Sequence, residues 1–368
     1  MSTGPRDQRE ADDDRGGHGR GLPADLTVAV TGPTGAVGKA VIRNLEQDDR
    51  VARVVGMARR PLEPVFLGWR KTQYLRGDVL DRDAVSELVA GADVVIHLAY
   101  AIFGSRRESA RVNVAGCRNV FETALRSGHP SRLVFMSSVA AYGYRADNPV
   151  PLTEYVEVGG SPEHYYSAHK AESEALLAEL TAGTGTQAYV LRPCLVAGPD
   201  AMPLIRHLRL APVSDRLPAT VKRLLAQLLP RLKPVVLDPG VPIQLVHHDD
   251  VGSAVCSAAL GEGPPGAYNL AAAGEVTMSD LAKVVGAFAV PVPHALAVAS
   301  SQLVNALPWV PAAAEWVHVV RYPMLMDTKR ARRDLGWDPA YTAREALESM
   351  KGTAFGLSYS ANMRGELG

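Results

Sequence analysis

The sequence predicts an α/β fold: a doubly wound, mostly parallel sheet with a smaller C-terminal region. Short apolar runs rich in β-branched residues lack polar alternation, as in parallel strands buried on both faces. The clearest are residues 26–30, 51–57, 94–99 and 133–136, and a short strand edge is expected at 74–75. Helical patterns separate these runs, so strands and helices alternate along the chain. The 368 residues suffice for a large core.

A glycine-rich turn follows the first apolar run. The run ends at Thr31, and Gly32, Gly35 and Gly38 follow at intervals of three, just as a helical pattern begins. Backbone N–H groups and the dipole at such a helix N-terminus attract anions. Gly32 would allow the tight turn, Gly35 the approach of a phosphate, and Gly38 close helix–strand packing. We therefore expect the pyrophosphate of a dinucleotide here, with Ala36 and Val37 beside it.

The end of the second apolar run carries information about the cofactor. An acidic residue about 20 positions after the glycines is typical where NAD is bound, because it accepts hydrogen bonds from the ribose. Here Ala58 is followed by Arg59 and Arg60. Guanidinium groups pair with a 2′-phosphate, whereas a carboxylate would repel it. The pattern favours NADP over NAD, although two solvated loop charges would also account for it.

Charge and cysteine content exclude several classes of protein. The formal net charge is zero, which does not suggest a nucleic-acid partner. Cys117, Cys194 and Cys256 lack metal-site spacing and are expected to be buried thiols of a cytoplasmic protein. Residues 1–25 nearly lack large apolar side chains and have no signal-peptide pattern, so a disordered tail is expected. A second tail is expected at 356–368.

A histidine-rich stretch has the composition of a metal site. It reads His247-His248-Asp249-Asp250. Because adjacent strand residues point to opposite faces, we expect no metal and predict that an Asp caps the helix beginning near Val251.

Two stretches in the second half have composition that suggests a surface role. Residues 284–314 hold no charged side chain, but prolines interrupt them, so no membrane span is expected. They would line an apolar pocket, or form an exposed patch at a homodimer or membrane surface. A helix near 219–229 with a basic face could bind an anion, or could simply be solvated.

Three polar side chains could perform proton transfer. The run at 133–136 delivers Ser138 to the carboxyl end of the sheet, where such folds bind ligands. Ser161-Pro162 predicts the start of a helix that carries Tyr166 and Lys170 on one face. A nearby ammonium would lower the pKa of a phenol and favour its ionised form. His97, within a strand, is expected to be a packed residue.

These motifs resemble the extended, epimerase/dehydratase-like branch of the short-chain dehydrogenase/reductase superfamily. The matches, in family order, are Thr31–Gly38, Gly77–Val79, His97–Ala99, Asn113–Gly116, Ser137–Gly143, Tyr166–Lys170, Leu191–Pro193, Val246–Val251 and Leu335–Pro339. The resemblance implies a Rossmann domain at 26–193, with a contribution from 241–262. It implies a substrate-binding region at 194–240 and 263–355.

The resemblance also implies the roles of the site residues. Ser138 lies four positions before the Tyr142-Gly143 pair, which selects it over Ser137. Tyr166 would be the general acid/base, Lys170 would support it and hold the nicotinamide ribose, and Ser138 would donate to the substrate oxygen. Further cofactor contacts are expected from Asp78, Val79, Leu98, Ala99, Asn113 and Pro193.

The implied reaction is hydride transfer between NAD(P) and a carbonyl or secondary alcohol. Sugar-nucleotide members of the family carry an Asn where this chain has Leu195, and 4,6-dehydratases carry Asp-Glu where it has Val139-Ala140. The first departure argues against a sugar-nucleotide substrate and the second against a 4,6-dehydratase. An apolar pocket wall formed by residues 284–314 would suit a small-molecule substrate of lower polarity. A sugar-nucleotide epimerase and a non-catalytic NAD(P)-binding sensor remain as alternatives.

Overall fold

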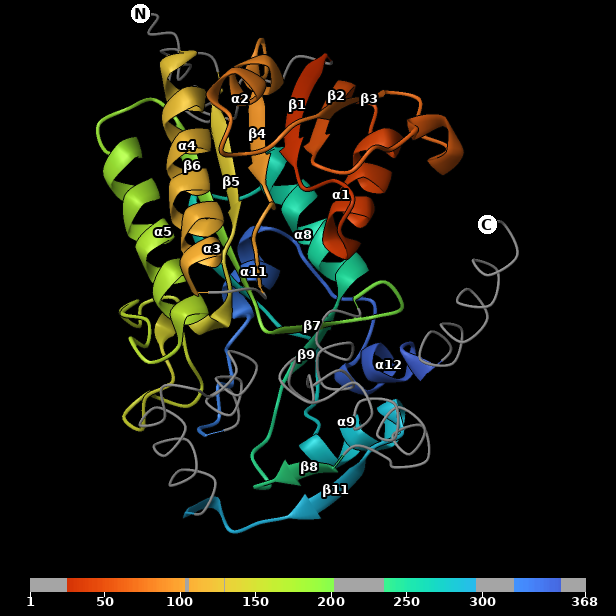
Figure 1. Ribbon diagram of the computed structural model, residues 1–368, viewed down its shortest axis with the longest axis vertical. Helices are drawn as coiled ribbons and strands as arrows, with labels where there is room; N and C mark the ends of the chain where they lie inside the picture. Colours follow the sequence, from red (N-terminus) through yellow and green to blue (C-terminus); the bar gives the residue numbers. More distant parts are fainter. Residues whose placement is uncertain (1–24, 103–105, 129, 202–234, 296–320, 352–368) are drawn as a thin grey trace, which may run out of the picture.

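The chain forms one seven-stranded, wholly parallel sheet with helices on both faces (Figure 1). The computed structural model describes residues 25–102, 106–128, 130–201, 235–295 and 321–351. The strand order is β10-β6-β5-β4-β1-β2-β3. The strands are β1 (Leu26–Thr31), β2 (Val51–Ala58), β3 (Thr72–Arg76), β4 (Val94–His97), β5 (Arg132–Met136), β6 (Gln187–Pro193) and β10 (Gly266–Leu270). The predicted doubly wound sheet is confirmed, and its direction of winding reverses between β1 and β4.

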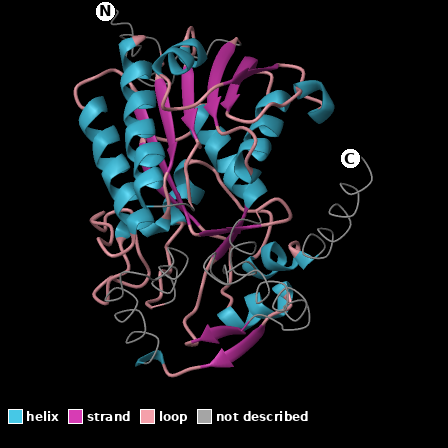
Figure 2. Cartoon of the chain, in the orientation of Figure 1, coloured by secondary structure: helices cyan, strands magenta, loops and turns pink. Residues whose placement is uncertain are grey.

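Two layers of helices bury the two faces of this sheet (Figures 1 and 2). One layer contains α1 (Ala36–Gln47) and α8 (His248–Ala259), and the other contains α2 (Arg82–Val89), α4 (Gly116–Arg126) and α5 (Tyr165–Thr181). Strand residues alternate between the layers: Val28 faces the first cluster and Ala29 the second. Both faces are therefore apolar, which explains the missing polar alternation.

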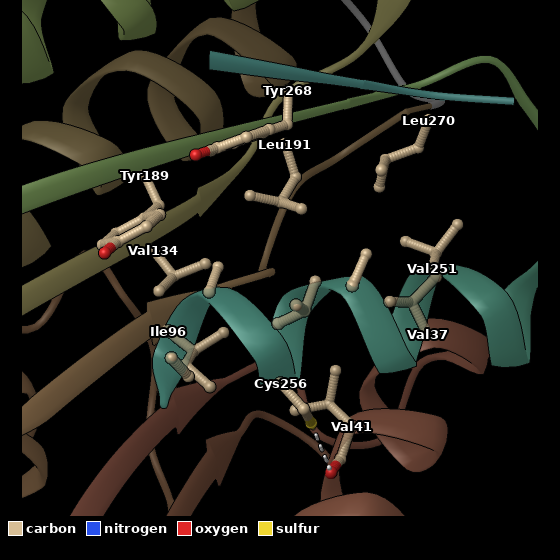
Figure 3. Close-up of a cluster of buried hydrophobic side chains, with 14 of the residues drawn as sticks. Val37, Val41, Ile96, Val134, Tyr189, Leu191, Val251, Cys256, Tyr268 and Leu270 are labelled. Carbon is tan, nitrogen blue, oxygen red and sulfur yellow. Dashed lines mark hydrogen bonds between the residues drawn. The ribbon is translucent and has the colours of Figure 1, made fainter. Parts of the chain in front are cut away.

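The first layer packs around α8, which crosses the sheet beside α1 (Figure 3). Val41 of α1 and Val251 of α8 are fully buried, together with Ile96 of β4. The Cys256 thiol donates to the Val41 carbonyl over 3.5 Å. Like Cys117 and Cys194, Cys256 is buried and unpaired, as predicted.

Between β4 and β5 the chain forms three consecutive helical segments. They are α3 (Arg106–Ala110), the π-helical turn η2 (Arg111–Ala115) and α4. Gly116 starts α4 where a Cβ would lie 2.8 Å from a Val79 side-chain carbon, so this turn of the helix sits tightly on the loop after β3.

A smaller region lies at the lower end of the molecule in Figure 1. In it β7 (Leu195–Ala197) pairs with β9 (Leu245–His247), and β8 (Val235–Asp238) pairs with β11 (Phe288–Pro291). The strands β7 and β9 share a separate apolar cluster with α9 (Met278–Val285) and α12 (Ala343–Glu348). The short helical turns are η1 (Pro64–Leu67) and η3 (Val139–Tyr142).

The boundary between the two regions differs from the predicted one. Residues 263–355 were expected in the smaller region, but β10 is the edge strand of the main sheet. The segment around α11 (Lys329–Asp334) packs there too, since Leu335 and Trp337 belong to the main core. Trp337 also donates its indole N–H to the Asp250 carbonyl over 2.8 Å.

Several predicted features lie outside the described residues: nearly all of both tails, the basic helix near 219–229, and much of the apolar run at 284–314. Among the helices that are described, we find none whose length and hydropathy would let it cross a bilayer.

Candidate active site

The turn after β1 forms a cradle that only small residues can line. Gly32 has φ of +74°, and a Cβ there would lie 3.0 Å from the Ala99 nitrogen. At Gly38 a Cβ would lie 2.2 Å from the Gly32 carbonyl oxygen. Gly35 is exposed and is the N-cap of α1, so it has no side chain to occupy the first-turn N–H groups. Ala36 is half-buried beside it. Open amides at a helix N-terminus fit a bound phosphate group.

The end of β4 forms one wall of this cradle. The Thr31 hydroxyl accepts hydrogen bonds from the backbone nitrogens of Leu98 and Ala99, each over 3.1 Å. It also lies 2.8 Å from His97 Nδ1. His97 is 1% exposed, and burial lowers its pKa to about 3, so it is the neutral, packed strand residue predicted. These contacts hold the backbone at Ala99 against Gly32.

The loops after β2 and β3 bring the predicted adenosine-side residues to the same sheet edge. Arg59 and Arg60 are exposed immediately after β2. The Tyr74 hydroxyl contacts the Ala58 carbonyl over 3.1 Å and also the Arg60 carbonyl, which ties this loop to β3. Asp78 accepts from the Leu80 nitrogen over 3.0 Å and so shapes its own loop.

Ser138 and Tyr166 meet at the carboxyl end of β5. Ser138 is the N-cap of η3, where its hydroxyl oxygen accepts from the Ala140 nitrogen over 3.2 Å. The Ser138 hydroxyl also lies near enough to the Tyr166 phenol for hydrogen bonding to lower the pKa of that phenol. Both side chains are half-buried. The structure therefore joins two of the three residues predicted for proton transfer.

The helix that carries Tyr166 begins later than predicted. Ser161 was expected to cap it, but α5 begins at Tyr165, and His164 caps it by accepting from the Ser167 nitrogen over 3.3 Å. The Ser161 hydroxyl instead accepts from the Tyr144 nitrogen over 2.7 Å. Ser161 thus holds the loop after η3 rather than the helix.

Lys170, the third predicted residue, is buried one turn after Tyr166. Its side chain is 1% exposed, and its ammonium donates to the Met136 carbonyl over 2.6 Å. The ammonium also lies 3.4 Å from the centroid of the Tyr100 ring. Burial lowers the pKa of Lys170 to about 7, against the opposing influence of Cys117 and Glu174.

The expected lowering of the Tyr166 pKa is wrong for this structure. Burial raises it to about 12, and the hydrogen bond with Ser138 only partly opposes this effect. The Lys170 ammonium is directed to the Met136 carbonyl and the Tyr100 ring, with its nitrogen 5.8 Å from the centroid of the Tyr166 ring. Desolvation of the phenolate therefore dominates.

A buried ion pair lies next to Ser137, the residue before Ser138. Arg192 Nη2 lies 2.7 Å from Glu174 Oε2, and both side chains are less than a tenth exposed. Ser137 donates to Glu174, and Arg192 donates to the Tyr142 hydroxyl over 2.8 Å. Ser137 thus belongs to a different network from Ser138. No sequence pattern indicated the Glu174–Arg192 pair, because the two residues are distant along the chain.

Asn113 and Pro193 occupy buried positions near this edge. The Asn113 side chain is fully buried in η2, accepts from the Ala101 nitrogen over 2.7 Å and donates to the Ala101 carbonyl over 2.9 Å. It therefore fixes the backbone that follows Tyr100. Pro193 is buried at the end of β6, and Val79 is 6% exposed.

The histidine-rich stretch is arranged differently from the prediction. The strand β9 ends at His247 and α8 begins at His248, so the alternation argument fails at this junction. Donor atoms of His247, His248 and Asp249 lie within 4.8 Å of one another, close enough for a metal ion. However, His247 Nδ1 already accepts from the Asp249 nitrogen over 3.2 Å, and Arg43 lies 3.3 Å from Asp249. The helix cap is therefore His247 and not an Asp.

Comparison with known proteins places this site in a family. An uncharacterized protein of Sinorhizobium fredii is 26% identical over 329 residues, which cover 87% of this chain and 76% of that protein. The L-arabinose 1-dehydrogenase (NAD(P)(+)) of Haloferax volcanii is 33% identical over 163 residues, 40% of this chain and 59% of that protein.

Solved structures share the fold. An epimerase of Methanothermobacter thermautotrophicus has a TM-score of 0.69 at 19% identity, covering 93% of this chain and 96% of its own. A short-chain dehydrogenase/reductase superfamily protein of Agrobacterium tumefaciens with bound NAD has a TM-score of 0.65 at 20% identity, covering 92% and 99%. The model of the NAD dependent epimerase/dehydratase family matches residues 28–271. The chain therefore belongs to the NAD dependent epimerase/dehydratase family.

Proposed function

We propose that this protein is an NAD(P)-dependent oxidoreductase that transfers hydride between nicotinamide and a carbonyl or secondary-alcohol substrate. The observation that carries the proposal is the approach of the Ser138 hydroxyl to the Tyr166 phenol at the carboxyl end of the sheet. A protein that only senses a dinucleotide has no need of a positioned proton donor. The buried Lys170, one helical turn away, adds a third side chain that can take part in proton transfer.

Proton transfer is the task of Tyr166 in this proposal. Bound nicotinamide supplies or accepts the hydride. With its pKa raised to about 12, the Tyr166 phenol is protonated at neutral pH, the form that reduction of a carbonyl requires. It gives its proton to the substrate oxygen, and in the reverse direction it takes that proton back. Ser138 donates a hydrogen bond to the same oxygen and orients it toward Tyr166.

Lys170 is proposed to stabilise negative charge on Tyr166 after the proton has left. A positive charge near a phenol favours the phenolate. Its ammonium is also the group proposed to hold the hydroxyls of the nicotinamide ribose. Both roles require that Lys170 is charged, and the pKa of about 7 makes this charge sensitive to pH near neutrality.

The proposed cofactor site runs along the carboxyl edge from β1 to β3. The N–H groups near Gly35, Ala36 and Val37 would hold the pyrophosphate, because the glycine cradle leaves room there. The exposed Arg59 and Arg60 would pair with a 2′-phosphate, which supports NADP over NAD. The other proposed contacts are Gly32, Gly38, Asp78, Val79, Leu98, Ala99, Asn113 and Pro193.

The substrate is proposed to be less polar than a sugar nucleotide. Leu195 begins β7, at the position where sugar-nucleotide relatives carry an Asn, and it offers no hydrogen bond to a diphosphate. Transient oxidation of a sugar nucleotide is the alternative that family membership itself favours. The two reactions differ in whether cofactor is used up.

Cofactor consumption separates these reactions. We would titrate NADPH and NADH against the protein, and then add carbonyl compounds of graded polarity while following reduced-nicotinamide absorbance. The proposal expects tighter binding of NADPH and net oxidation with at least one carbonyl compound. Isomerisation of a UDP-sugar without net oxidation, and no oxidation with any carbonyl, would overturn it.

A further inference from the structure

Tyr100 touches two of the proposed catalytic side chains, although nothing so far assigns it a role. It follows Ala99 and lies three residues after the end of β4. Its ring centroid lies 3.4 Å from the Lys170 ammonium, and its ring meets that of Tyr166 edge-on at 5.6 Å. A cation centred at this distance over a ring face is attracted by the negative face of the π system.

Aromatic rings dominate the surroundings of the Lys170 ammonium. Besides Tyr100, the rings of Phe135 and Tyr166 have their centroids 4.8 Å and 5.8 Å from the nitrogen. Within the described part of the chain, the acceptor of its hydrogen bond is the Met136 carbonyl. Tyr100 is therefore the closest of the rings to the cation, by more than 1 Å.

The ionisable groups near Lys170 offer it little negative charge. From β4, His97 is neutral because burial lowers its pKa to about 3. From α4, Cys117 is a protonated thiol because burial raises its pKa to about 11. From α5, Glu174 is bound by Arg192, and Tyr166 is protonated at neutral pH. The ring face of Tyr100 is thus the nearest source of negative potential after the Met136 carbonyl.

We propose that Tyr100 is a positioning residue whose ring face holds the Lys170 side chain in its charged form next to Tyr166. The attraction acts on the ammonium and not on the neutral amine, so it favours protonation of Lys170 against the effect of burial. The catalytic consequence rests on the proposed function, whereas the contact itself does not. Removing the negative ring face should therefore lower the pKa of Lys170.

The contact can be tested without turnover, by NMR titration of the full chain carrying ¹³Cε-labelled lysine. The sequence has eight lysines, and loss of one resonance in Lys170→Arg assigns Lys170. We would compare phenylalanine with pentafluorophenylalanine at position 100, since the two rings have nearly the same shape and opposite quadrupoles. The fluorinated ring should lower the titration midpoint of Lys170 by about 1 pH unit relative to phenylalanine. Equal midpoints would overturn the proposal.

The consequence for activity is tested by the pH profile of kcat. In the phenylalanine variant the alkaline limb should stay close to that of the unmodified protein. In the fluorinated variant it should move to lower pH, by the same amount as the NMR midpoint. An unmoved limb despite a shifted midpoint would overturn the positioning role. Absence of any turnover contradicts the proposed function, and the NMR comparison still decides the contact.

Discussion

The glycine cradle allows two neighbouring substitutions with opposite expected outcomes. In Gly38→Ala the new Cβ would lie 2.2 Å from the Gly32 carbonyl oxygen and 2.8 Å from two Pro33 backbone atoms. These are backbone atoms, so α1 would have to move away from β1. In Gly35→Ala the nearest atom would be 3.6 Å away, an ordinary contact, and the backbone φ of −75° suits alanine.

The magnitudes follow from these distances. Overpacking of a tight backbone contact costs about 1–3 kcal/mol, so Gly38→Ala should destabilise the fold by that amount. Gly35→Ala should change stability by less than about 0.5 kcal/mol, as for a substitution without new contacts. Its methyl group, however, would enter the proposed phosphate cradle. We expect at least about tenfold weaker cofactor binding, equivalent to about 1.4 kcal/mol.

Two measurements check this pair of variants. Thermal unfolding without added cofactor reports stability, and fluorescence titration with NADPH reports binding. Gly35→Ala should unfold like the unmodified protein and bind weakly, whereas Gly38→Ala should unfold at lower temperature. If Gly35→Ala binds NADPH with undiminished affinity, the phosphates do not rest on this turn and the reasoning is refuted.

Three further outcomes are expected. Arg59→Ala combined with Arg60→Ala should abolish the preference for NADPH over NADH in competitive binding; equal affinities in the unmodified protein would contradict the assignment. Glu174→Ala should destabilise the fold by about 3–5 kcal/mol in urea unfolding, because it leaves the Arg192 charge buried and unpaired, while Glu174→Leu with Arg192→Met should recover most of that loss. The third variant is Lys170→Met. In the folded protein the pKa of Lys170 is about 7, below the ordinary 10.5, so between these two pH values the unfolded chain binds a proton that the folded protein does not. The unmodified protein therefore becomes more stable as the pH rises through this range. The free energy of unfolding of Lys170→Met, relative to that of the unmodified protein, should thus be about 2–3 kcal/mol larger at pH 6 than at pH 9. A difference that does not change with pH would disprove the lowered pKa of Lys170.

Local patterns predicted the parts of the fold that depend on short-range physics. Buried strands have no polar alternation, and Gly32 and Gly38 stand where a side chain would collide with backbone. The choice of Ser138 came from family resemblance, and in the structure its hydroxyl lies near the Tyr166 phenol. The strand pattern and the glycine spacing are encoded within a few neighbouring residues, whereas the approach of Ser138 to Tyr166 joins two segments that are separate in the sequence.

The features that were missed depend on contacts between distant segments. The exact end of β9 decides whether His247 and His248 diverge or converge, and alternation cannot locate such a junction. Likewise Ser161 has the chemistry of a helix cap but is used by Tyr144. Tyr100 carried one detectable signal: it follows a buried strand at the carboxyl edge of the sheet, where ligands bind.

The electrostatic prediction failed for a similar reason. Placing Tyr166 and Lys170 four residues apart establishes a common helix face, but not how deeply that face is buried. Burial determines the direction of both pKa shifts, and burial is a property of the assembled fold.

The central claim is that Tyr166 gives the proton that accompanies hydride transfer, and its most direct test is a single-turnover measurement. Reduced cofactor and a carbonyl substrate would be mixed with excess protein, and cofactor oxidation would be followed for the unmodified chain and for Tyr166→Phe. If Tyr166 gives this proton, the rate should fall by about 10²–10⁴-fold in Tyr166→Phe while cofactor affinity is kept. An unchanged rate in that variant would contradict this claim.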